Sequence, residues 1–206
     1  IRLGILFFAA KQHEEGEVCL KEVLKIDPRQ GLAHQALAKF YRRNDDLESA
    51  RPHAVEALKI RGGDPSEFLE LAGELLELER PRDARILLEK GIFDHPDDAD
   101  IAVRLAIATQ NDESTRDKAA WRFREAESLS GVDGPATEPD FQLAFSDYLL
   151  ESGQTKAAEE RLGKAINSYP EEATAETAAA LRKLAGIWQE DGRNESAARS
   201  LLKRAD

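Results

Sequence analysis

Four copies of one residue pattern follow each other at a constant spacing of 34 residues, and this repeat limits the folds that the chain can adopt. The first column of the pattern is leucine in every copy: Leu3, Leu37, Leu71 and Leu105. The second column is small in every copy: Gly4, Ala38, Ala72 and Ala106. A fixed period of roughly 20–50 residues is typical of solenoids, in which each unit packs only against its neighbours. The chain is therefore expected to fold as a row of similar units.

Each unit contains two stretches with the periodicity of an amphipathic helix. In the second copy, Leu37 and Tyr41 fall on one face of a first helix. Ala50 and Ala57 fall on one face of a second helix, and the polar segment 42–46 separates the two. Leu, Ala, Glu, Arg and Lys dominate the composition and β-branched runs are few, which favours helix over strand. The sequence predicts an all-α protein.

The pattern continues beyond these four copies, after a break at residues 131–140 that contains Gly and Pro. Ala158 and Pro170 fit the columns of a fifth copy, and Ala197 and Leu201 fit those of a sixth. We predict a single repeat domain over residues 1–206 with six units, at approximately 1–30, 31–64, 65–98, 99–131, 138–172 and 173–206. Because the first unit begins partway through its first helix, the domain is expected to be a fragment of a longer protein.

The order of the columns resembles the tetratricopeptide repeat, TPR. Leu, Gly or Ala and an aromatic or large residue are followed by Ala, a large apolar residue, Ala and a closing Pro, such as Pro28 or Pro96. The resemblance implies a right-handed superhelical solenoid of antiparallel helix pairs, whose first helices line a concave groove. Gly62 replaces one closing Pro, and Pro52 lies within a second helix. Since an interior proline costs about 3 kcal/mol, we expect a kink or a late helix start at Pro52.

No pattern typical of catalysis or of metal binding stands out in the sequence. The four histidines form no His-Glu-x-x-His pair, and the single cysteine, Cys19, excludes an internal disulfide and a cysteine-based zinc site. The acidic run at residues 94–100 falls at a turn between units, where Asp side chains commonly cap helices. We expect no catalytic residue, no cofactor and no metal site in this chain.

The formal net charge of −11 at pH 7 bears on the class of partner. Neutralisation of phosphates supplies most of the affinity of nucleic-acid binders, so this charge argues against nucleic acid. It also disfavours the alternative of an RNA-binding helical repeat. The apolar opening stretch 1–10 is short, carries Arg2 and fits a first repeat helix better than a secretory signal. We expect no membrane insertion of this chain.

Lys39, Arg42 and Arg43 form a basic cluster at helical spacing in this acidic chain. By the repeat register they lie on the groove side of a first helix. The cluster is a candidate for binding an acidic side chain or a carboxyl terminus. The alternative is a solvated surface whose charges are paired by nearby carboxylates: Asp45, Asp46 or Glu48.

An apolar strip is the second candidate feature of the groove. The strip consists of first-helix residues from several units: Leu69, Leu76, Val103, Ile107, Leu143 and Leu150. It could bind an extended peptide or an amphipathic helix, together with Arg104 of the same register. The alternative is that these side chains pack neighbouring first helices against each other.

Ile1, Ile5 and Phe8 are expected to form an apolar patch at the amino end of the groove. A preceding segment, a second copy of the chain or a partner could cover the patch, so self-association is one possibility. The function that fits these features is a non-catalytic scaffold that binds a protein or peptide in its groove. The alternative is a regulatory or substrate-recruiting appendage of a larger enzyme.

Overall fold

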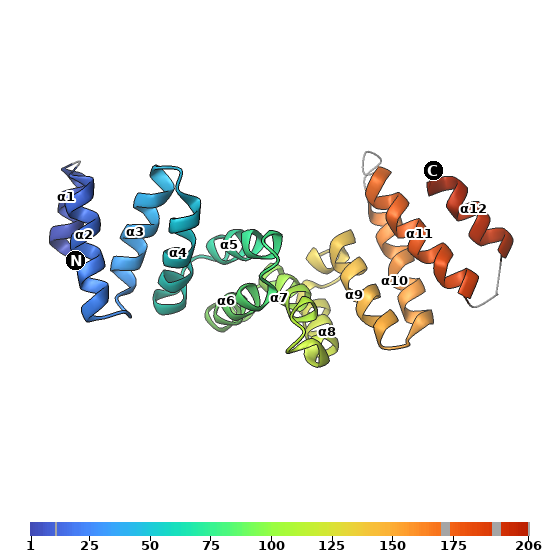
Figure 1. Ribbon diagram of the computed structural model, residues 1–206. Coiled ribbons are helices and arrows are strands. Elements are labelled where there is room, and N and C mark those ends of the chain that lie inside the picture. Colours follow the sequence, from blue (N-terminus) through green and yellow to red (C-terminus); the bar gives the residue numbers. More distant parts are fainter. Residues whose placement is uncertain (11, 170–173, 191–194, 206) are drawn as a thin grey trace. The chain divides into compact units, whose positions relative to one another are not determined.

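The computed structural model describes residues 1–10, 12–169, 174–190 and 195–205, and the regular elements in these ranges are all helices (Figure 1). The α-helices are α1 (Arg2–Ala9), α2 (His13–Ile26), α3 (Gly31–Arg43), α4 (Leu47–Arg61), α5 (Pro65–Glu77), α6 (Pro81–Asp94), α7 (Ala99–Asn111), α8 (Ala119–Ser130), α9 (Pro139–Glu151), α10 (Thr155–Ser168), α11 (Thr174–Glu190) and α12 (Glu195–Ala205). Two short 3-10 helices are η1 (Arg116–Lys118) and η2 (Pro135–Thr137). The all-α prediction is confirmed.

The chain divides into two compact units, Ile1–Pro96 with α1 to α6 and Asp97–Asp206 with α7 to α12. Consecutive helices pack together in antiparallel pairs (Figure 1). In the first unit, α4 contacts both α5 and α6 of the next pair. In the second unit, α9 contacts α7 and α8, and α11 contacts α10. Each pair thus covers part of the apolar face of its neighbour within the unit.

The leucine column lies in the core of both units. Leu37, Leu71 and Leu105 are at most 1% exposed. Ala72 and Ala106 of the small column are fully buried beside them. Small side chains allow helices to approach closely while large ones fill the space between them, which explains why both columns recur.

Leu3 departs from this column, since its side chain is 57% exposed. Helix α1 approaches α2 through Gly4, where an added Cβ would lie 2.8 Å from the side chain of Leu20. That distance is shorter than real Cβ contacts, so the close approach requires glycine. With Gly4 turned toward α2, Leu3 and Leu6 face solvent.

The turn between α4 and α5 explains why a glycine replaces the closing proline of the second repeat. Helix α4 ends at Arg61, and Gly62 follows with a φ of 74°. Proline cannot take this conformation because its ring fixes φ near about −65°. Helix α5 then begins at Pro65, and the Glu67 carboxylate accepts a hydrogen bond of 3.2 Å from the backbone N–H of Asp64.

Pro52 lies inside α4, which begins at Leu47, so the late helix start, one of the two outcomes expected at this proline, is wrong. The proline sits near the amino end of the helix, where the carbonyl that it leaves without a partner is that of Glu48 in the first turn. Pro52 has no N–H to donate to this carbonyl, so the helix continues through the proline with one intrahelical hydrogen bond fewer.

The prolines that close the first and third repeats follow their helices as predicted. Helix α2 ends two residues before Pro28, and α6 ends two residues before Pro96. Pro170, in the equivalent column of the fifth repeat, lies outside the described residues, as do the side chains of Ala197 and Leu201.

Residues 131–140, which interrupt the repeat, form an ordered connection within the second unit. Ala136 in η2 is buried, and its backbone N–H donates to Ser130 Oγ at 2.7 Å. Its carbonyl accepts a hydrogen bond of 2.6 Å from Nε2 of the buried Gln142. The connection therefore joins α8 to α9 through specific hydrogen bonds and a buried side chain.

Candidate functional site

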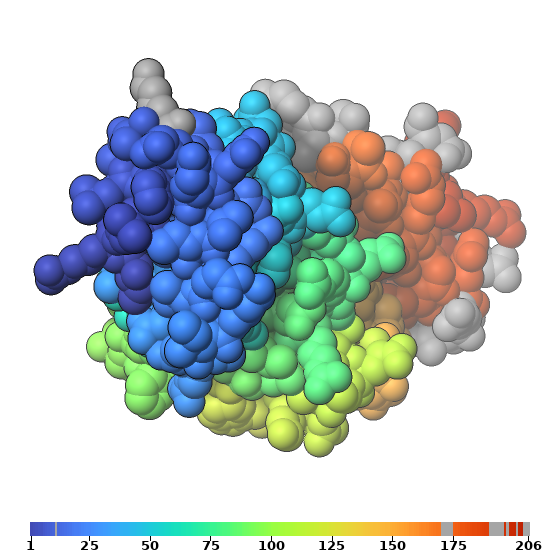
Figure 2. Space-filling view, turned by 60° about the vertical axis from the view of Figure 1, so that its left-hand side comes forward, coloured from blue at the N-terminus to red at the C-terminus, as the bar shows by residue number. Residues whose placement is uncertain are grey.

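Helix α3 has one side that is exposed and an opposite side that is buried. Gln35, Lys39 and Arg42 are spaced i, i+4 and i+7, so they lie on one face of the helix. Ala33 and Leu37 on the other side are fully buried. This burial fixes the rotation of α3 and turns the basic residues outward. The surface formed by α1 to α3 comes forward in Figure 2, where it is blue.

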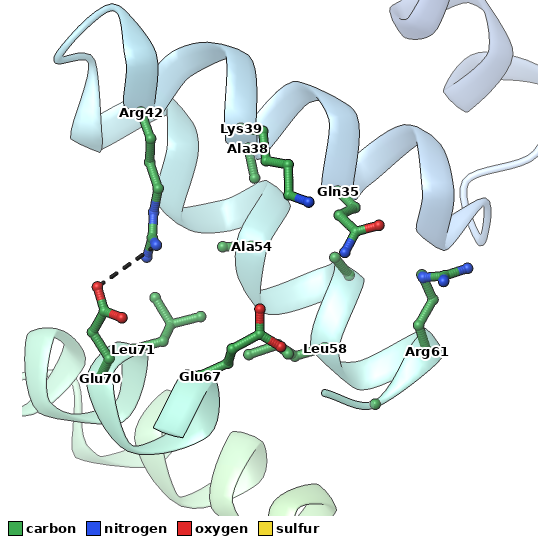
Figure 3. A pocket seen from close by; sticks show the side chains of 12 residues that line it. Gln35, Ala38, Lys39, Arg42, Ala54, Leu58, Arg61, Glu67, Glu70 and Leu71 are labelled. Carbon is green, nitrogen blue, oxygen red and sulfur yellow. Dashed lines mark ion pairs between the residues drawn. The ribbon is translucent and has the colours of Figure 1, made fainter. Parts of the chain in front are cut away.

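Two pockets flank α3 within the first unit, and they have two lining residues, Gln35 and Lys39, in common. The α3–α5 pocket lies between α3, α4 and α5, and its wall includes Arg42 and Arg61 (Figure 3). The α1–α3 pocket lies on the other side of Lys39, and its wall includes Arg43. The basic cluster predicted from the sequence therefore occupies the ridge between two hollows.

Carboxylates from α5 occupy the basic side of the α3–α5 pocket. Arg42 extends toward Glu70, with 3.6 Å between Nη1 and Oε1 (Figure 3). A second carboxylate, Glu74, lies 3.6 Å from Arg42 Nη2 and 3.2 Å from Arg51 Nε. The partners of Arg42 thus come from the next repeat, and not from the segment that follows α3, as the alternative interpretation assumed.

The α1–α3 pocket combines an apolar floor with a cationic rim. Phe8 and Phe40 stack with their ring centroids 4.5 Å apart and an interplanar angle of 8°. Leu32 adds a side chain that is 43% exposed. Lys39 and Arg43 on the rim are exposed. Among the described residues, neither side chain forms an ion pair. None of the described residues that line the pocket is Asp or Glu.

The predicted apolar patch at the amino end belongs partly to the core. Ile1 and Phe8 are half-buried and pack against the cluster that contains Leu20 and Leu37. Ile5 is 42% exposed and lines the α1–α3 pocket. The apolar surface that remains at this end is thus a wall of the same pocket.

The other predicted groove residues are distributed over both units. Leu69 and Leu76 of α5, in the first unit, are half-buried. In the second unit, Val103 is buried and Arg104 and Ile107 of the same helix are half-buried.

Leu143 and Leu150 of α9 are half-buried and pack against a cluster of the second unit. The cluster contains Leu162 of α10 and Leu184 and Ile187 of α11. Packing between helices therefore occupies part of the surface of these two leucines.

Among the residues of the α1–α3 pocket that were not predicted from the sequence are Leu32 and Phe40. They are spaced i and i+8 around Ala36, so the three form a stripe along α3. An apolar stripe beside a basic one on the same helix was the signal available in the sequence. It was hidden because the neighbouring Leu37 and Tyr41 satisfied the repeat columns.

Among the described residues, no group of three or more His, Cys, Asp or Glu side chains could hold a metal ion. His95 and Asp98, in the acidic run at residues 94–100, have structural partners. His95 Nε2 lies 2.8 Å from the carbonyl of Gly63, and Asp98 caps α7 by accepting a hydrogen bond from the N–H of Ile101. No helix in the described ranges is long and apolar enough to span a membrane.

Comparisons with known proteins identify the fold. No protein-family model and no curated protein sequence matches the chain. Among solved structures, PilF of Pseudomonas aeruginosa is 18% identical, with a TM-score of 0.58 over 99% of this chain and 86% of that one. MamA is 18% identical, with a TM-score of 0.64 over 82% of this chain and 92% of that one. YrrB, described as a TPR protein with an unusual peptide-binding site, is 18% identical, with a TM-score of 0.53 over 83% and 85%. The chain has the helical-repeat fold of the tetratricopeptide-repeat proteins.

Proposed function

We propose that the chain is a non-catalytic protein-interaction scaffold, and that the surface of its first unit around α3 binds a peptide segment of a partner. The observation that carries the proposal is the pair of pockets that meet at Lys39. An elongated ligand that crosses α3 contacts both hollows at once. YrrB, which has the same fold, is described as having a peptide-binding site, and this likeness of fold supports the proposal.

The apolar and the basic residues of the two pockets are proposed to have different roles in binding. Affinity would come mainly from apolar anchors that enter the α1–α3 pocket beside Phe8 and Phe40. Orientation and partner choice would come from Lys39, Arg42 and Arg43. Leu69 and Leu76 of α5 are proposed as further contacts in the first unit.

In the second unit, the proposal includes the predicted residues of α7 and α9 as a separate contact surface. These residues are Val103, Arg104, Ile107, Leu143 and Leu150. Since Val103 is buried and both leucines pack on the core, this surface is expected to contribute less to peptide binding than the surface around α3.

A display library of random peptides, selected on the immobilised full chain, tests this function. We expect enriched peptides whose binding is lost in the Lys39→Glu/Arg43→Glu double variant. The control is Arg124→Glu/Lys156→Glu, which makes the same change of charge at exposed positions of the second unit. The absence of enriched peptides, or peptides that bind the first double variant as well as they bind the unchanged chain, would refute the proposal.

A further inference from the structure

We infer that the α1–α3 pocket recognises a short acidic peptide segment that carries one aromatic or large aliphatic anchor, with the anchor on the apolar floor and one or two Asp or Glu carboxylates on Lys39 and Arg43. The inference rests on the proposed function and specifies the chemistry of the ligand.

The floor of the pocket includes small residues, which leave room for a side chain of the ligand. Ala9 at the end of α1 and Ala36 in the middle of α3 both line the pocket. Stacked Phe8 and Phe40 lie beside them, and the exposed part of Leu32 continues the apolar surface. An aromatic or branched aliphatic group would bury this surface, which otherwise stays in contact with water.

The rim fixes the charge of the ligand. Lys39 and Arg43 are one turn apart on α3, and His13 of α2 lies beside the same floor, with its ring centroid 5.5 Å from that of Phe40. Among the described residues that line this pocket with them, there is no Asp or Glu. A basic or quaternary ammonium ligand is therefore disfavoured there, although the floor is aromatic.

Lys39 and Arg43 differ from Arg42 in that they have no ion pair in the described ranges. Arg42 already has two carboxylates of α5, Glu70 and Glu74, within 3.6 Å. The chain has a net charge of −11, yet it leaves these two cations exposed beside an apolar hollow. Charge complementarity thus favours an acidic occupant at this place and not at the α3–α5 pocket.

The geometry of α3 also limits the spacing of the carboxylates. Residues four apart on a helix are separated by about 6 Å along its axis. In an extended peptide, residues two apart are separated by about 7 Å and project to the same side. Carboxylates on both sides of the anchor would therefore project away from it, toward Lys39 and Arg43. We expect an acidic–apolar–acidic order, since its two carboxylates have nearly the spacing of Lys39 and Arg43 along α3.

Four synthetic peptides with blocked ends test the inference by fluorescence anisotropy with the full chain at low salt. The first has one Trp between two Asp, the second replaces both Asp by Asn, the third replaces both by Lys, and the fourth replaces Trp by Ala. We expect the first peptide to bind about five- to ten-fold more tightly than the second, with a preference that falls as salt is added. The third and fourth peptides are expected to bind more weakly still.

Two protein variants assign the effect to this pocket. In Lys39→Gln/Arg43→Gln the ratio of affinities for the Asp and Asn peptides is expected to fall to about one. In Ala36→Leu, the added side chain fills the floor and is expected to weaken both peptides equally, with circular dichroism as the check on folding. The Arg124→Gln/Lys156→Gln variant in the second unit is the control for net charge, and it should keep the preference.

The outcomes separate this inference from the broader function. Equal affinity for the Asp and Asn peptides, no detectable binding of the Asp peptide, or a preference that survives in Lys39→Gln/Arg43→Gln overturns the inference. Peptides selected from the display library that still need the α3 surface would then leave the scaffold function standing. Sedimentation that shows self-association of the chain, lost in the same double variant, would identify a second copy as the occupant and would also overturn the inference.

Discussion

His34 Nδ1 lies 2.9 Å from His53 Nδ1, and this contact joins α3 to α4 in the first unit. The other ring nitrogen of His34, Nε2, lies 3.0 Å from the carbonyl oxygen of Pro28. Because a carbonyl can only accept, His34 Nε2 must carry the proton. Nδ1 of His34 then accepts the hydrogen bond, and Nδ1 of His53 donates it.

Several titratable groups surround His53. The ring of Tyr41 stacks on it with centroids 5.8 Å apart, and Tyr41 also donates a hydrogen bond of 2.7 Å to Glu17. Burial is the main reason why the pKa of His53 is lowered, and repulsion from His34 and Lys21 lowers this pKa further. The carboxylate of Glu17 has the opposite and smaller effect on the pKa of His53.

The lowered pKa of His53 predicts that the chain becomes less stable in mild acid. The unfolded chain binds a proton at His53 below pH about 6.5, while the folded chain resists this protonation. The free energy of unfolding should therefore be highest above that pH and should fall as the pH decreases through it. The His53→Gln variant, which keeps a donor and does not titrate, should show a smaller loss.

Urea denaturation of the full chain between pH 8 and 5, followed by circular dichroism, measures this difference. His13→Gln is the matched control, because His13 is exposed. A His53→Gln variant that loses as much stability in mild acid as the unchanged chain would falsify the role assigned to His53.

The repeat pattern predicted the helices well because the features that define them are local. The spacing of Leu37 and Tyr41, the cap at Asp98 and the glycine–proline turn before α5 depend on residues within a few positions of each other. The exposure of Leu3 could not be read in the same way. It depends on which face of α1 meets α2, and that is decided by a contact between Gly4 and a residue of another helix.

The candidate site shows the same division between local and distant information. Helical spacing brought Lys39, Arg42 and Arg43 to one side of α3. It could not show that Arg42 pairs with carboxylates of the next repeat while the other two have no ion pair in the described ranges. The partners of each cation depend on how α3 packs against α5, and this packing cannot be read from helical spacing. The sequence therefore indicated a basic surface, but it did not show which of its cations form ion pairs within the chain.

The difference in burial between two leucines at the end of α5 predicts a large loss of stability when one side chain is truncated and a small one when the other is. Leu75 is fully buried, whereas Leu78, just after the helix, is 46% exposed. Leu75→Ala should lower the free energy of unfolding by about 2–5 kcal/mol, because it leaves a cavity. Leu78→Ala should change it by less than about 0.5 kcal/mol. Urea denaturation followed by circular dichroism compares the two, and similar losses would contradict the assignment of this core.

Arg161 connects α10 to α8 and α9 in the second unit. Its guanidinium contacts both carboxylate oxygens of Glu127, with 3.1 Å between Nη2 and Oε2, and lies 4.3 Å from the ring centre of Phe145. Lysine keeps the charge but loses the two-pronged contact and the stacking. Arg161→Lys should therefore destabilise the second unit by about 1–2 kcal/mol.

Fluorescence is a suitable measurement for this variant, because both tryptophans of the chain, Trp121 and Trp188, lie in the second unit. The control is Lys164→Arg, at an exposed pair of side chains within α10. If the denaturation midpoint of Arg161→Lys matches that of the control, the contact with Glu127 does not stabilise the fold.

At the amino-terminal cap of α7, the stabilising effect of a hydrogen bond can be distinguished from that of a negative charge. Asp98 Oδ1 accepts a bond of 2.8 Å from the N–H of Ile101, and the exposed Asp97 precedes it. Asp98→Ala should lower the free energy of unfolding of the second unit by about 1 kcal/mol. Asp98→Asn keeps the acceptor and loses only the charge near the helix start, so most of the stability should remain. Tryptophan fluorescence in urea measures both variants, with Asp97→Ala as the control. Equal losses in Asp98→Ala and Asp98→Asn would mean that the negative charge, and not the hydrogen bond, stabilises this end of the helix.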